Sequence, residues 1–223
     1  MRDNSKRVSA AADSAAAQPA EAFSFATPTE IVELPSKGRF YPPEHPLHNE
    51  ETIEIKYMTA KEEDILTSPA LLKKGVALDR LIQNVILDKD ISVDTLLSGD
   101  KSAIMIASRI NGFGAEYRTK VLCPSCSNES EATFDLSEVE AYYGDDYGDH
   151  DVASTENGTF IIKTPVTKLD VEVRLLNSKD ESYLVKRQTA KNKSDLDTSL
   201  SDMIRMILVS VNGQNGHDFF RQF

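Results

Sequence analysis

Four prolines within twelve residues constrain the fold of this 223-residue chain more than any other feature of its sequence. They are Pro35, Pro42, Pro43 and Pro46. A proline fixes its own φ and pushes the residue before it toward extended geometry, and both effects oppose a helix. The sequence therefore predicts an extended arm over residues 35–46, with a turn at Gly38.

The arm carries four residues that could make contacts beside this turn, namely Lys37, Arg39, Phe40 and Tyr41. One interpretation is that the arm uses these four residues to clamp a neighbouring subunit. The other is that Phe40 and Tyr41 pack on the chain's own core. The sequence leaves both interpretations open.

Hydrophobic periodicity on either side of the arm separates strands from helices. β-forming residues over 30–34 predict a short edge strand, and alternation over 52–58 predicts a half-buried strand. Thr59 and Glu62 then have the spacing of a capping box, which predicts that a helix begins there.

A helical stripe follows between residues 76 and 87, where apolar residues recur at three- and four-residue steps. Its members are Leu78, Leu81, Ile82, Val85 and Ile86. We expect this face to be buried. Asp100 is expected to cap a further helix over residues 101–110, which ends near Gly112.

The period changes to strand-like alternation after Ala115. Residues 117–121 and 132–136 predict a hairpin, and the tight turn between its strands contains Cys123-Pro124-Ser125-Cys126. Two further strands are predicted over residues 159–163 and 169–175.

Two helical patterns complete the chain. An apolar stripe from Leu196 to Val211 predicts a final amphipathic helix that ends at Asn212-Gly213. Residues 217–223 resemble the opening of another helix whose phenylalanines we expect to meet a partner or a missing continuation of the chain.

The fold class predicted from these patterns is α+β. It combines a helical half with a small antiparallel β-hairpin region that has a zinc-ribbon-like knuckle. Residues 1–29 are polar and rich in alanine and serine, which predicts a disordered N-terminal arm. Residues 30–114 are predicted to form a Pro-rich arm and helical module, and residues 115–223 a β-hairpin region with C-terminal helices.

The Cys123–Cys126 pair is the one metal-binding motif that the sequence offers. A C-x-x-C turn places two thiolates correctly for a tetrahedral metal, but structural zinc takes four nitrogen or sulfur ligands. The pair therefore predicts either a hairpin without metal or an incomplete zinc site that a second copy or another subunit completes. Redox chemistry is disfavoured, because no helix begins after the motif to lower the pKa of a thiol.

Composition narrows the classes of function. A net charge of −11 argues against a surface for binding nucleic acid, and it fits a basic or neutral protein partner. The sequence contains no apolar run that could span a membrane and no secretory h-region, so we expect no membrane contact and a cytoplasmic location. It also contains no phosphate loop, nucleophile elbow or zinc-protease motif, and we therefore predict that the protein is not an enzyme.

Several long sequence segments, which occur in a fixed order, give a family resemblance over about residues 30 to 215. They are LPSKGRFYPPEHPL, IEIKYMTAKEEDILTSPALLKKG, LDRLIQNVILDKDISVDTLLSGDK and RINGFGAEYRTKVLCPSC. These segments resemble those of the T4-type phage baseplate hub assembly proteins, which are needed to build the central hub of contractile tails.

The resemblance implies a protein of the phage tail baseplate that is either a hub subunit or an assembly chaperone. It implies hub and tape-measure proteins as partners, a second copy as a further candidate, and assembly in the host cytoplasm. The alternative function is a small zinc-ribbon module that binds nucleic acid or the transcription machinery. A hydrolase of the tail tip is a third hypothesis.

Overall fold

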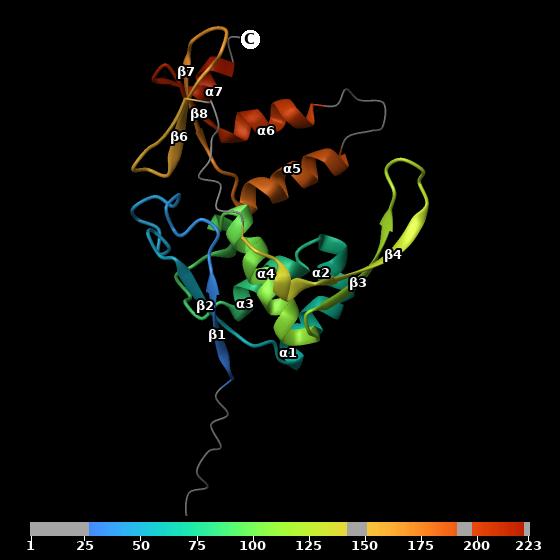
Figure 1. Ribbon diagram of the computed structural model, residues 1–223. Coiled ribbons are helices and arrows are strands. Elements are labelled where there is room, and N and C mark those ends of the chain that lie inside the picture. The colour runs from blue at the N-terminus through green and yellow to red at the C-terminus, as the bar shows by residue number, and fades with distance from the viewer. Residues whose placement is uncertain (1–26, 142–150, 191–197, 221–223) are drawn as a thin grey trace, which may run out of the picture.

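The computed structural model describes residues 27–141, 151–190 and 198–220 of the chain. Within them, helices and small antiparallel sheets are mixed, which confirms the predicted α+β class (Figure 1). The predicted disordered arm lies outside the described residues, except for residues 27–29. No helix in the described ranges is both long enough and apolar enough to cross a bilayer.

The N-terminal half begins with two antiparallel strands, β1 (Thr29–Glu33) and β2 (Thr52–Lys56). Its helices are α1 (Ala60–Thr67), α2 (Pro69–Lys74), α3 (Ala77–Val85), the 3-10 helix η1 (Val93–Thr95) and α4 (Ser98–Phe113). Alternation places Ile53 and Ile55 of β2 on the buried face, where they meet α3 and α4 in one hydrophobic core. Burial of such a side chain stabilises the fold by about 1.5–3 kcal/mol.

Helix α3 largely has the predicted apolar face. Leu81, Ile82 and Val85 are buried in the core, as the stripe predicts. The expectation for Leu78 is wrong, because its side chain is 48% exposed. Leu78 lies in the first turn of α3 and lines a surface groove, which leaves its side chain open to solvent.

Glu62 joins three elements from inside this half. It is fully buried and forms the predicted capping box with Thr59 at the start of α1. Its Oε1 accepts hydrogen bonds from Lys56 Nζ (2.8 Å) and Asn84 Nδ2 (3.1 Å). Burial would raise the pKa of this carboxyl, but the hydrogen bonds from Lys56 and Thr59 outweigh burial and lower the pKa to about 2.

The predicted hairpin is present as β3 (Glu116–Leu122) and β4 (Glu129–Asp135). The strands pair with each other in an unbroken register from Glu116↔Asp135 to Leu122↔Glu129, and in the part of the chain that the structure describes they form a separate two-stranded sheet. Figure 1 shows the hairpin standing away from the rest of the molecule. A short 3-10 helix, η2 (Leu136–Glu138), follows at its base.

The C-terminal half is built on a five-stranded antiparallel sheet in sequential order. Its strands are β5 (Val152–Ser154), β6 (Thr159–Lys163), β7 (Asp170–Arg174), β8 (Leu208–Val211) and β9 (Gln214–Asn215). Three helices accompany the sheet: α5 (Ser178–Ala190), α6 (Ser199–Ile207) and α7 (Gly216–Phe220).

The prediction that the final helix continues to Val211 is wrong over its last turn. The chain leaves the helical conformation after Ile207, and residues 208–211 form strand β8 instead. Asn212 and Gly213 have φ values of 47° and 77°, which is the pattern of a type I′ turn between β8 and β9. The Asn-Gly pair therefore joins two strands and does not end a helix.

Candidate functional site

The Pro-rich segment is held by one buried carboxylate, Asp100. The prediction that Asp100 caps a helix starting at residue 101 is wrong, because α4 begins at Ser98 and Asp100 lies buried in its first turn. Its oxygens accept hydrogen bonds from Ser36 N (2.9 Å), Ser36 Oγ (2.6 Å) and Tyr41 Oη (2.8 Å). Its position near the N-terminal end of α4 also favours negative charge. The arm is therefore a folded loop fixed to α4.

Tyr41 is the central aromatic residue of this loop. Its ring stacks on His45 at 4.3 Å, and its hydroxyl accepts a hydrogen bond from Leu97 N (3.1 Å). Burial and the nearby Asp100 charge raise the pKa of Tyr41 far above its ordinary value, so the hydroxyl keeps its proton and donates. Tyr41 thus joins the loop to the start of α4.

His45 completes the buried side of the loop. Its Nδ1 accepts a hydrogen bond from Leu47 N (3.1 Å), so Nε2 carries the proton and donates to Thr95 Oγ1 (2.8 Å). Burial lowers the pKa of His45, which favours this neutral tautomer.

Phe40 connects the loop to the C-terminal sheet. Its ring lies 5.0 Å from that of Phe160, and its backbone lies against Gly158. Arg39 is exposed, with its guanidinium 5.4 Å from the Phe40 ring, and Lys37 is half-buried. The structure thus places Phe40 and Tyr41 against the chain's own body. That Lys37, Arg39, Phe40 and Tyr41 bind a partner stays a prediction.

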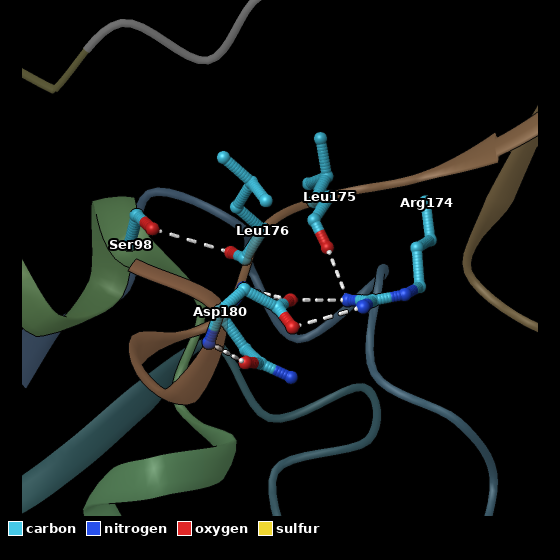
Figure 2. Close-up of polar contacts among 6 residues, drawn as sticks. Ser98, Arg174, Leu175, Leu176 and Asp180 are labelled. Atoms are coloured by element: carbon cyan, nitrogen blue, oxygen red, sulfur yellow. Dashed lines mark hydrogen bonds and ion pairs between the residues drawn. The ribbon is translucent and has the colours of Figure 1, made fainter. Parts of the chain in front are cut away.

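A polar junction joins the start of α4 to the start of α5 (Figure 2). The backbone N and the Oγ of Ser98 each donate to the carbonyl of Leu176 at 3.2 Å. Arg174 holds Asp180 with two hydrogen bonds of 2.5 and 3.0 Å. Burial would raise the pKa of Asp180, but the bonds from Arg174 and from Asn177 N keep it below its ordinary value. This junction joins residues on both sides of position 114, and the predicted division of the chain into modules 30–114 and 115–223 stays a prediction.

A groove of about 630 Å³, here called the acidic groove, runs between β1, α4 and residues 136–141. Its α4 wall contains two isoleucines, Ile106 and Ile110, and four small residues, namely Gly99, Ser102, Ala103 and Ala107. Its acidic lining residues are Glu30, Glu33 and Glu140. Small side chains let a foreign backbone approach α4 closely, and the carboxylates favour a basic segment.

A second groove of about 320 Å³, here called the apolar groove, lies on another side of α4. Its lining includes Met58, Leu78, Met105, Phe113 and Tyr117. Phe113 is 53% exposed, although the Arg109 guanidinium lies 5.1 Å from its ring. Leu136 lines both grooves, so the base of the hairpin lies beside each of them.

The tip of the hairpin presents the predicted cysteine pair at the surface. Cys126 is exposed, Cys123 is half-buried, and both are free thiols. The backbone N–H groups of Cys126 and Ser125 and the Cys126 side chain donate to the Cys123 sulfur, which lowers the pKa of that thiol. Within the described ranges, no group of three or more His, Cys, Asp or Glu side chains could hold a metal. Zinc binding stays a prediction.

The two cations on β3 have acidic neighbours. Arg118 Nε lies 2.6 Å from Glu116 Oε1, and Lys120 Nζ lies 3.8 Å from Glu129 Oε2. These pairs reduce the positive potential that the hairpin would offer to a phosphate backbone. Nothing about the hairpin therefore favours the nucleic-acid-binding alternative over a protein partner.

Sequence reasoning missed the role of Asp100 and both grooves. The partners of Asp100 lie 59 and 64 residues away along the chain, and no local pattern specifies such contacts. The exposed Leu78 could have indicated the apolar groove only if the position of α4 were known.

A comparison with known protein families matches residues 27–215 to the family described as T4 bacteriophage base plate protein. The match covers nearly all of the structure described above. No curated protein and no solved structure matches the chain.

Proposed function

Because the chain belongs to the family of T4 bacteriophage base plate proteins, we propose that it helps to build the central hub of the tail baseplate through protein–protein contacts. In this role it is a structural or assembly protein of the virion tail baseplate and catalyses no reaction. Its partners are hub and tape-measure proteins, met during assembly in the host cytoplasm.

The acidic groove is the observation that carries the contact mechanism. It combines an α4 wall of four small residues and two isoleucines with the carboxylates of Glu30, Glu33 and Glu140. The whole chain has a net charge of −11, so a basic partner is attracted over long range as well as in the groove. We expect the occupant to be a segment of a hub protein with basic residues flanking an apolar stripe.

The test is an affinity pull-down of the tagged full chain from infected cells, with captured proteins identified by mass spectrometry. Wild-type chain is expected to recover hub and tape-measure proteins. A Glu33→Lys/Glu140→Lys variant is expected to recover them at least ten-fold less, because like charges then face the basic segment. Recovery of nucleic acid or polymerase subunits instead would overturn the proposal in favour of the zinc-ribbon alternative.

A matched control separates groove contacts from net charge. Glu51→Lys/Glu131→Lys makes the same change in charge at two exposed acids that do not line the acidic groove. It should retain the partners. Equal loss in both variants would show that long-range attraction alone is responsible.

The proposed role of the loop residues is tested in the same assay. Lys37→Ala/Arg39→Ala is expected to weaken recovery, because Arg39 is exposed, Lys37 is half-buried and both are cations. Unchanged recovery would confine the binding site to the grooves.

The two forms of the proposal differ in where the protein ends up. A hub subunit remains in purified virions at a fixed ratio to other hub proteins, whereas an assembly chaperone is found with baseplate intermediates and is missing from finished particles. Quantitative mass spectrometry of both fractions separates the two.

A further inference from the structure

The tip of the β3–β4 hairpin carries two cysteines, and a tetrahedral structural metal site takes four such ligands. Cys123 and Cys126 lie on one tight turn, and Cys123 N donates to Asn128 O at 3.0 Å across its base. The C-x-x-C spacing on such a turn suits two ligands of one tetrahedral metal. Ser127 takes the left-handed conformation (φ 56°), and its N–H donates to Cys123 O at 2.9 Å, which closes the turn tightly. Two thiolates held together in this way suit Zn²⁺, which takes four such ligands in structural sites.

The remaining ligands do not come from the described part of this chain, where no third His, Cys, Asp or Glu side chain joins the pair. The position of the tip favours completion from outside. The hairpin projects from the body (Figure 1), and within the described ranges its strands pair only with each other, so its tip is accessible to a second tip. Beside the cysteines, Val121 is 40% exposed and Leu122 is 59% exposed. Contact between two tips would cover these apolar side chains.

We propose that two copies of this chain join at their hairpin tips by sharing one Zn²⁺, bound by Cys123 and Cys126 of each copy. A two-fold axis through the metal relates the two cysteines of one copy to the two cysteines of the other. The metal then has four ligands, as a closed structural site requires. Each of the four thiols gives up its proton to solvent as the metal binds. The inference is independent of the proposed hub role, since it requires no other protein.

The experiment uses the purified full chain with a thiol reductant, prepared with added zinc and without chelator. We expect about one zinc per two chains by elemental analysis, and a dimer by light scattering that becomes a monomer when a chelator removes the zinc. A monomer under these conditions, or a dimer that persists without zinc, would refute the shared site.

Three variants locate the site. Cys123→Ser and Cys126→Ser are each expected to abolish both zinc binding and the dimer. Ser125→Ala is the matched control on the same turn, and it should retain both because it leaves the two proposed sulfur ligands in place. Because the tip is exposed, we expect circular dichroism to show the same fold in all three.

Cobalt gives a readout that does not depend on any variant. Co²⁺ bound to the wild-type chain should show thiolate-to-metal absorption of a four-sulfur site at half an equivalent of metal. The spectrum of a two-sulfur site, saturating at one equivalent, would mean that each chain binds its own metal and would overturn the proposal.

Discussion

Replacement of Asp100 with asparagine tests whether one buried carboxylate holds the Pro-rich loop on α4. In the wild type, Oδ2 accepts from the hydroxyls of both Ser36 and Tyr41. Each hydroxyl already accepts a hydrogen bond from a backbone N–H, Gly38 N for Ser36 and Leu97 N for Tyr41. An asparagine with its oxygen at the Oδ2 position keeps both hydroxyl bonds but turns its NH₂ group toward Ser36 N–H, and the flipped amide instead presents a donor to both hydroxyls. Either orientation loses at least one contact.

The expected cost follows from these contacts. A hydrogen bond to a charged group contributes about 1.5–3 kcal/mol; at least one bond is lost outright and the others no longer have a charged acceptor, so the gross cost is roughly 3–4 kcal/mol. A neutral amide is easier to bury than a carboxylate and recovers part of this, which leaves a net destabilisation of about 2–3 kcal/mol. Tyr41→Phe should cost about 2 kcal/mol, because it removes one of these bonds and leaves Leu97 N–H without its acceptor.

Urea unfolding of the single and double variants measures both the cost and the coupling. Because Asp100 and Tyr41 share a bond, the double variant should be more stable than the sum of the single effects predicts, by at least about 1 kcal/mol. Asp94→Asn is the control, since Asp94 is exposed on η1, and its effect should stay within about 0.5 kcal/mol. Additive effects, or an Asp100→Asn cost no larger than the control, would refute the role assigned to the carboxylate.

Two further predictions concern acid stability and close packing. The folded pKa of Glu62 is about 2, against an ordinary value of 4.5, so its stabilisation is complete above pH 4.5 and is lost as the pH falls toward 2. With allowance for solvent screening at the partly exposed Lys56, the free-energy difference between wild type and Glu62→Gln should shrink by about 2 kcal/mol as the pH falls from 4.5 to 2, measured by urea unfolding. A difference independent of pH would contradict this. Gly158→Ala should destabilise by roughly 2–4 kcal/mol, because φ is +74° and the new Cβ would lie 2.5 Å from Phe40 O. Gly75→Ala, with φ +67° but open space around the Cβ, should cost only about 1 kcal/mol; equal thermal shifts would show that contact with Phe40 is unimportant.

The local patterns of the sequence were sufficient for most elements. Alternation identified β2 and the hairpin strands, and the Thr59–Glu62 spacing identified the start of α1, because each depends on residues close in the chain. The Asn212-Gly213 pair was misinterpreted for a related reason. A helical stripe and a short strand before a type I′ turn share their apolar residues, and only pairing of β8 with β7 separates them.

The candidate site depended on contacts that the sequence cannot locate. Asp100 at a helix start is compatible with an ordinary cap, and only its meeting with Ser36 and Tyr41 in three dimensions makes it an anchor. The same holds for Leu78, whose exposure depends on what covers α3. The cysteine pair was visible, because the spacing of a C-x-x-C turn is itself local.

The positions of the anchors explain which surfaces are left for partners. Asp100 fixes the Pro-rich loop to α4, and the ring of Phe40 lies against Phe160 of the C-terminal sheet. Among the described residues, the strands of the hairpin pair only with each other, and at its base Leu136 lines both grooves. A partner segment that fills either groove must therefore contact the root of the hairpin and restrict its direction. For this reason we expect the binding of a hub segment and the pairing of two hairpin tips to be coupled. A bound hub segment should raise the zinc affinity of the wild-type dimer. The same segment should change the zinc affinity of a Leu136→Ala variant less.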